Sequence, residues 1–314
     1  MHFFQRLLIC VLSLLLACQP LNAEQISLDQ HALHYAQWGM PASEQKKPVV
    51  LLLSGPIDTW HSDSAWWFSL APSLADKWHV IALDRAGQVF GNADAPLGYR
   101  HFAHDLHLFI RKLGLQDVSI ISFASANISV MLYLQKHADI HQVLMIDPDV
   151  LSPYSINRYK QDAQPFIENA KAYAEYIAAG KYTARVEQKN AGELAHIRTL
   201  IEKDVDIGYL QKRQANRLDI NNQLNLFKEI AAYPADLDAA ANLTFPANIR
   251  LTVIDTQFEQ GYINDSEDEA VKQELRQWMQ DAKAYYQGLA KQSKQGHRPS
   301  SKLISSGSLS SLCW

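Results

Sequence analysis

Three histidines stand at three-residue intervals on one predicted helix, and imidazole nitrogens are common ligands of zinc. They are His101, His104 and His107, and Asp105 is the only carboxylate near them in the sequence. Steps of three residues spread the side chains over a wide arc of a helix, so the rings do not converge on one point. We therefore interpret them as a solvated helix face, and we predict neither a metal nor another cofactor.

The first 23 residues have the pattern of an export signal. A weakly basic start precedes an unbroken apolar run over residues 7–17, which is too short to span a bilayer. Ala23 supplies a small residue for cleavage before Glu24. We predict a signal peptide over residues 1–23 and a periplasmic or secreted mature protein. The alternative is a lipoprotein signal, in which a processed Cys18 carries lipid and anchors the protein to a membrane face.

Composition excludes several classes of function. The chain has 314 residues, of which 47% are hydrophobic, enough for one α/β domain with an insertion. Its formal net charge of -4 comes without a basic run, so we expect no nucleic-acid partner. After the N-terminus no apolar run is long enough for a membrane span. Cleavage after Ala23 would leave Cys313 as the only cysteine and allow no internal disulfide.

The middle of the chain alternates strands with helices. Continuous apolar runs are typical of strands that are buried on both faces; they occur at residues 48–53, 78–84, 118–121, 142–147 and 249–255. Helical spacing of apolar residues predicts a helix over residues 102–113, which Gly114 ends. A composition rich in Ala, Gln, Lys and Glu predicts helices over residues 154–243, and a further long helix over 266–291. This alternation predicts an α/β fold with a doubly wound, mainly parallel sheet.

Residues 48–148 resemble the first half of an α/β-hydrolase. Five short motifs carry the resemblance by their order and spacing: Ser54-Gly55-Pro56, Asp63-Ser64-Ala65-Trp66-Trp67, Val80-Ile81-Ala82-Leu83-Asp84-Arg85-Ala86-Gly87, Leu113-Gly114-Leu115 and Ile146-Asp147-Pro148. The resemblance implies a core over residues 24–151, a helical lid over 152–245 and a second core half over 246–314. It also implies a buried site for a small substrate or ligand, because such lids exclude water.

The nucleophile position can be aligned in two ways. In this family a nucleophile stands on a strained turn between a strand and a helix, a histidine activates it, and an acid orients the histidine. Counting from Gly114 or from His137 places Ala124 on the turn, with small residues two positions away on either side, and we favour this alignment. The other alignment places Ser125 there, as the best candidate nucleophile.

The resemblance also implies where the other catalytic groups stand. Orienting acids are expected at Asp255 or Glu259, and Asp149 is another position that some relatives use. Ser54 and Gly55 match the segment that supplies oxyanion donors.

The expected histidine is missing from its usual place. A histidine is expected just after the last strand, where this chain has Ser308, and His297 is a weak substitute. The serine-rich ending suggests a hypothesis, that a frameshift near residues 295–305 replaced the true terminus. Translation of the other reading frames tests it: neither frame encoding a Gly-His step followed by an amphipathic helix would refute it.

Two functions follow from the sequence. In the first, the chain is a hydrolase of small esters or related acyl compounds with Ser125 as its nucleophile. Alternatively, it is a catalytically inactive α/β-hydrolase-fold protein that binds a small hydrophobic ligand or a partner. The fold by itself does not decide between them.

Overall fold

A seven-stranded sheet forms the centre of the protein. The computed structural model describes residues 22–40, 47–55, 63–89, 92–200 and 207–293. The strands lie in the order β1-β2-β4-β3-β5-β6-β7; they are β1 (Asn22–Ser27), β2 (Ala32–Trp38), β3 (Val49–Ser54), β4 (His79–Leu83), β5 (Val118–Phe123), β6 (Ile140–Ile146) and β7 (Arg250–Ile254). All five predicted strands are present, and the predicted fold class is confirmed.

The sheet is parallel from β4 to β7 and antiparallel at one edge. The pairs β4–β3, β3–β5, β5–β6 and β6–β7 are parallel, whereas β2 pairs antiparallel with both β1 and β4. The two strands that begin this edge, β1 and β2, come earlier in the chain than the five strands that the apolar runs predict. The predicted cleavage point, between Ala23 and Glu24, falls inside β1.

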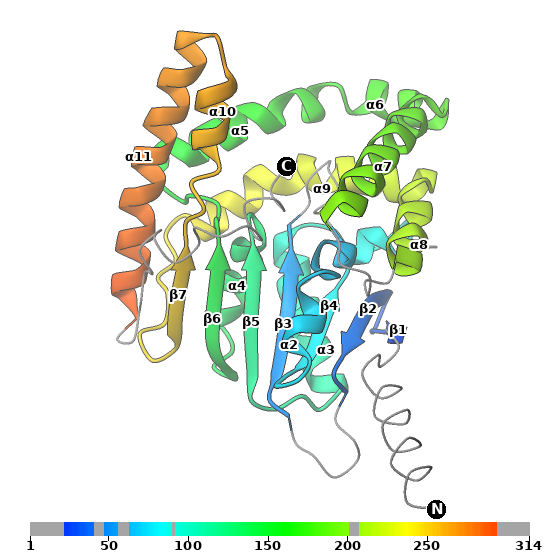
Figure 1. The fold of residues 1–314 in the computed structure, drawn as a ribbon, viewed down its shortest axis with the longest axis vertical. Helices are drawn as coiled ribbons and strands as arrows, with labels where there is room; N and C mark the ends of the chain where they lie inside the picture. Colours follow the sequence, from blue (N-terminus) through cyan, green and yellow to red (C-terminus); the bar gives the residue numbers. More distant parts are fainter. Residues whose placement is uncertain (1–21, 41–46, 56–62, 90–91, 201–206, 294–314) are drawn as a thin grey trace, which may run out of the picture.

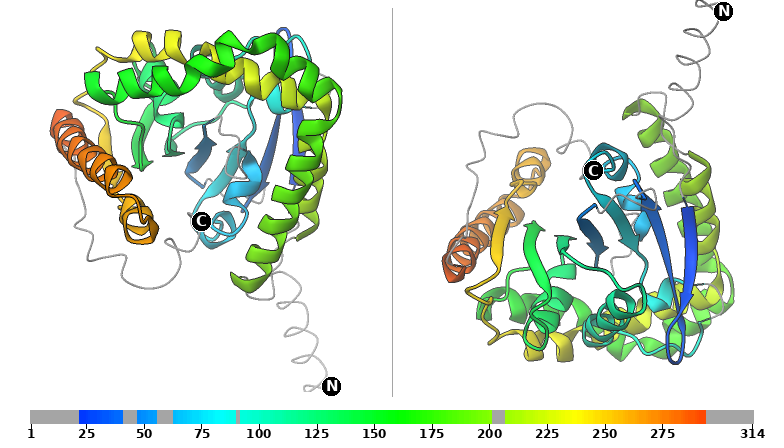
Figure 2. Two further views of the ribbon diagram at one scale, coloured as in Figure 1. Left: turned by 90° about the horizontal axis from the view of Figure 1, so that it is seen from above. Right: turned by 90° about the horizontal axis from the view of Figure 1, so that it is seen from below.

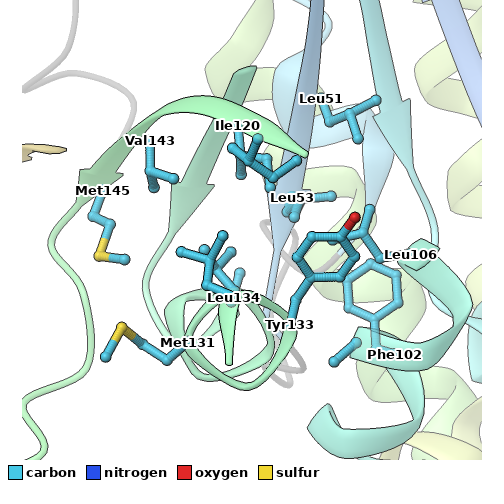
Figure 3. Packing of buried hydrophobic residues seen from close by; sticks show 14 of the residues in the cluster. Leu51, Leu53, Phe102, Leu106, Ile120, Met131, Tyr133, Leu134, Val143 and Met145 are labelled. Carbon is cyan, nitrogen blue, oxygen red and sulfur yellow. The ribbon is translucent and has the colours of Figure 1, made fainter. Parts of the chain in front are cut away.

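Helices cover both faces of the sheet because the central strands are apolar on both. In β3, Leu51 and Leu53 face one layer, whereas Val50 and Leu52 face the other. The first layer contains α3 (Tyr99–Lys112), α4 (Ala126–Leu134) and α11 (Glu269–Gln292). Figure 3 shows its centre. The second layer contains the short helices η2 (Ser64–Trp67) and α2 (Ala71–Leu74).

Five helices are inserted between β6 and β7, as the composition of residues 154–243 predicts. They are α5 (Pro153–Glu168), α6 (Ala170–Ala178), α7 (Lys181–Leu200), α8 (Ile207–Arg217) and α9 (Ile220–Ala240). They lie beyond the carboxyl ends of the parallel strands (Figure 1), and α5, α9 and α7 border that end when it is seen from above (Figure 2). We call residues 153–240 the helical insertion.

Buried ion pairs attach the helical insertion to the sheet. Arg213 Nη1 lies 3.3 Å from Asp84 Oδ2, and Arg217 Nε lies 2.6 Å from Asp63 Oδ2. Arg217 also binds Glu193 of α7, so its guanidinium joins two helices to the loop before η2. None of the helices in the described part of the chain has the length and apolarity needed to span a bilayer.

Two predicted features lie at least partly outside the described ranges. The export signal up to residue 21, including Cys18, is one of them. The other is the terminus from residue 294 onward, which contains His297, Ser308 and Cys313.

Candidate functional site

The turn between β5 and α4 has Ala124 at its strained position. Ala124 has a φ of 46°, in the left-handed region that L-residues with a Cβ seldom adopt. Its backbone N–H donates to the Ile146 carbonyl at 3.0 Å, which fixes the turn to the neighbouring strand. Ser125 follows with an ordinary helical φ of −61°. The chain therefore adopts the alignment with Ala124 on the turn, and a methyl group stands where the resemblance expects a nucleophile.

Ser125 lies beside the turn and packs against Gly55. Its side chain is buried, and a Cβ placed on Gly55 would lie only 1.8 Å from Ser125 Oγ. Tyr99 is a further neighbour: burial raises the pKa of Tyr99, and the nearby Ser125 hydroxyl opposes that rise. No described histidine is a hydrogen-bond partner of Ser125. Its role as a nucleophile stays a prediction.

The predicted oxyanion segment, Ser54 and Gly55, ends strand β3 next to this turn. The Ser54 carbonyl accepts a hydrogen bond of 2.8 Å from Arg85 Nη1. Arg85 is itself held by the buried carboxylate of Glu229, which comes from α9. A guanidinium thus fixes the end of β3, and the close approach of Ser125 requires a glycine at position 55.

The predicted acids lie near the carboxyl end of β7. Asp255 follows the strand and caps the next turn by accepting from the Gln257 N–H at 3.1 Å. Glu259 begins α10 (Glu259–Asp265) and is buried. Burial raises the pKa of Glu259 to about 7, and the negative charges of Asp147 and Asp255 act in the same direction. Both carboxyl groups therefore lie at the end of the sheet where α/β folds bind ligands.

Asp147 is a site residue that the sequence analysis did not assign. Its φ of 42° is left-handed, and its carboxylate accepts from the Thr256 N–H at 2.7 Å and from the Thr256 hydroxyl. Burial raises the pKa of Asp147 to about 6 against these hydrogen bonds. A left-handed aspartate directly after a buried strand has no signature in a single sequence, because any loop residue could follow there.

Asp149 lies beside the strained turn. Asn127, in the first turn of α4, accepts from the Asp149 N–H and donates to the Asp149 carbonyl, both at 3.1 Å. The Tyr233 hydroxyl of α9 donates to Asp149 Oδ2. Burial raises the pKa of Asp149 to about 6. The structure therefore combines a carboxyl group from the core with a tyrosine from the helical insertion.

Several described histidines pair or stack with residues other than Ser125. His34 Nδ1 lies 2.7 Å from Asp84, and His31 Nε2 lies 3.0 Å from Asp105. His101 and His104 are exposed, and the His107 ring stacks on His137 at 3.9 Å. Within the described ranges, no group of three or more His, Cys, Asp or Glu residues could hold a metal ion.

Comparisons with known proteins identify the fold. No protein-family model matches the chain, and no curated protein sequence matches it significantly. Among solved structures, the haloalkane dehalogenase DatA from Agrobacterium tumefaciens C58 is 11% identical, with a TM-score of 0.53 over 76% of this chain and 79% of that chain. The epoxide hydrolase CorEH is 16% identical, with a TM-score of 0.52 over 75% and 82% of the two chains.

A third solved structure is similar to this chain. An α/β-hydrolase-fold protein from Burkholderia ambifaria is 14% identical, with a TM-score of 0.52 over 76% of this chain and 80% of that chain. At such low identities the likeness concerns architecture alone. With its strand order, its helical layers and these structural neighbours, the chain has the α/β-hydrolase fold.

Proposed function

We propose that this protein binds a small ligand at the carboxyl end of its sheet and has no nucleophile at the position from which its fold usually presents one. One observation carries the proposal. Ala124 takes the strained, left-handed place on the turn, and its side chain has no atom that can attack a substrate. The turn therefore has a strained backbone but no nucleophilic side chain at its strained position.

The surroundings of the turn support a binding role. Ala124 and Asp149 keep partly exposed side chains, although α5 and α9 lie beyond this end of the sheet (Figure 2). Asp147, Asp149 and Glu259 have raised pKa values, and perturbed carboxyl groups gather at functional sites more often than elsewhere. We propose that the helical insertion acts as a lid that shields a small, largely apolar ligand from water.

Export is part of the proposal. Cleavage after Ala23 would place Glu24 at the new N-terminus, where its carboxylate accepts hydrogen bonds of 2.6 Å from Tyr35 and Gln37 of β2. These contacts would hold the shortened β1 on the sheet. A lipid-modified Cys18 would instead leave a short tether before the same strand.

A second function is favoured by the position of Ser125. Its hydroxyl lies against Gly55 and near the Tyr99 hydroxyl, beside the segment that the resemblance assigns to oxyanion binding. In this alternative Ser125 attacks small esters or related acyl compounds from beside the turn, with Glu259 or Asp255 as the acid. Its activating base would come from residues outside the described ranges, such as His297.

Labelling with a fluorophosphonate probe separates the two functions. The experiment uses the full exported chain, after sequencing of the gene has confirmed its natural ending, alongside Ser125→Ala and Ser129→Ala. Ser129 is a buried serine of the same helix whose hydroxyl donates to the Tyr99 carbonyl. We expect no labelling above that of Ser125→Ala. Labelling that is lost in Ser125→Ala and kept in Ser129→Ala would overturn the binding proposal.

A further inference from the structure

Asp149 is held rigidly next to the strained turn. Both polar atoms of the Asn127 side chain bind its backbone, and Asn127 is fully buried in the first turn of α4. The same helix begins directly after Ala124 and Ser125. The carboxyl group of Asp149 therefore has a fixed position relative to the turn, as a recognition group requires.

The Asp149 carboxylate has no positively charged partner among the described residues. Its one side-chain hydrogen bond comes from the neutral Tyr233 hydroxyl, and no Lys, Arg or His of the described ranges forms an ion pair with it. Three other deeply placed acids differ, because Asp84, Asp63 and Glu229 each bind an arginine. A carboxylate that is largely shielded from water and has no counter-charge is unfavourable, and a cationic ligand would relieve that cost.

Tyrosines from four separate helices gather around this carboxylate. Tyr99 comes from α3, Tyr159 from α5, Tyr233 from α9 and Tyr285 from α11. Burial raises the pKa of each, and the charge of Asp149 raises it further. Two of these hydroxyls are placed by direct contacts, because Tyr233 donates to Asp149 and Tyr159 accepts from the N–H of the adjacent Val150 at 3.1 Å.

The aromatic rings form a connected group. The Tyr233 ring lies 5.4 Å from Tyr99 and 6.0 Å from Tyr159, centroid to centroid, and Trp278 lies 6.3 Å beyond Tyr159. Tyr159, Tyr233 and Tyr285 keep partly exposed side chains, as does Asp149. Partly exposed tyrosines and a carboxylate without a cationic partner among the described residues thus occur together at the carboxyl end of the sheet.

We infer that this tyrosine-lined place around Asp149 binds the ammonium group of a small organic cation. Aromatic faces attract a cation through their quadrupole, and they do so most strongly where water is excluded. The carboxylate supplies the counter-charge, and the rings cover the alkyl groups that a quaternary ammonium carries. The inference rests on the proposed ligand-binding function and specifies the chemical class of the ligand.

Choline and its uncharged isostere 3,3-dimethyl-1-butanol are suitable probes, because they differ in charge but hardly in shape. Isothermal titration calorimetry of the full chain is expected to show choline binding at least about tenfold tighter than the alcohol. Equal affinities, or no choline binding at millimolar concentrations, would overturn the inference.

Asp149→Asn tests the counter-charge, and Asp139→Asn is its matched control. Asp139 also accepts a tyrosine hydrogen bond, from Tyr133 at 2.7 Å, but at the far end of α4. We expect Asp149→Asn to weaken choline binding at least about tenfold, whereas Asp139→Asn leaves it unchanged. An Asp149→Asn protein that binds choline as the wild type does would contradict the inference.

A second pair of variants keeps the test decisive if Asp149→Asn does not fold. Tyr233→Phe retains the ring and is expected to keep choline binding, whereas Tyr233→Leu removes an aromatic face and is expected to weaken it several-fold. Equal binding by both variants would contradict a role for the ring. Labelling of Ser125 would refute the proposed function separately, because it reports on the turn and not on the charge of a ligand.

Discussion

Arg85 and Glu229 form a buried ion pair that joins the core to the helical insertion. Arg85 Nε lies 3.0 Å from Glu229 Oε1, and each side chain is almost completely removed from solvent. The same guanidinium donates to the Ser54 carbonyl at the end of β3. One contact therefore connects α9, the loop after β4 and the segment beside the strained turn.

Loss of the Glu229 carboxylate should destabilise the protein strongly. Glu229→Ala leaves the Arg85 charge buried without a partner, and we expect the free energy of unfolding to fall by about 3–5 kcal/mol. Glu274→Ala is the control, because Glu274 pairs with Arg158 at 2.9 Å but is about half exposed. Denaturant titrations should show a control change below about 1 kcal/mol. Similar losses in both variants would contradict the prediction.

The backbone strain at Ala124 should lower the free energy of unfolding by a measurable amount. A glycine there has no Cβ to oppose a left-handed φ, so Ala124→Gly should stabilise the fold by about 1 kcal/mol. Ala126→Gly, at the buried first residue of α4, should destabilise it by about 1 kcal/mol. Thermal unfolding of both variants tests this contrast. Destabilisation by Ala124→Gly of the same size as that by Ala126→Gly would show that the turn is not strained.

The close approach of Gly55 and Ser125 should appear as energetic coupling. Gly55→Ala places a methyl group on Ser125 Oγ, and we expect a loss of roughly 1–3 kcal/mol. Ser125→Gly removes the obstructing side chain, so the double variant should recover part of that loss. A double-mutant cycle of unfolding free energies measures the coupling, and strict additivity would contradict it.

Glu259 should make stability depend on pH. Its folded pKa, about 7, is raised from the usual 4.5, so its stabilising contribution is complete below pH 4.5 and is lost as the pH rises through 7. Glu259→Gln should therefore be more stable than the wild type at pH 8, by up to roughly 3 kcal/mol, and gain nothing at pH 4. Equilibrium unfolding at both values provides the test. A gain of equal size at pH 4 would point to a cause other than titration.

Much of the fold could be predicted from apolar runs. Strand β3 is buried on both faces, so each residue from Val49 to Leu53 is apolar and the run is unmistakable. The antiparallel strand β2 was harder to identify, because His34 and Gln37 interrupt it to bind Asp84 and Glu24. Polar side chains that are satisfied inside the fold look like loop residues in a sequence.

The candidate site was only partly predictable. Spacing from Gly114 and His137 selected Ala124 correctly, because the lengths of a strand and a helix are constrained on either side of the turn. The tyrosines around Asp149 could not be grouped in this way. They come from four helices, and only the packing of α5, α9 and α11 over the sheet brings them together.

The ion pairs of the helical insertion also limit the order in which the protein can fold. Asp63, Asp84 and Arg85 are synthesised early, but their partners, Arg217, Arg213 and Glu229, come much later in the chain. Until those partners emerge, the first half of the core would have to bury Asp63, Asp84 and Arg85 without their ion pairs to the helical insertion, although His34 also pairs with Asp84. We therefore expect an N-terminal fragment ending at residue 151 to lack a stable native state of its own, because the helical insertion supplies these partners.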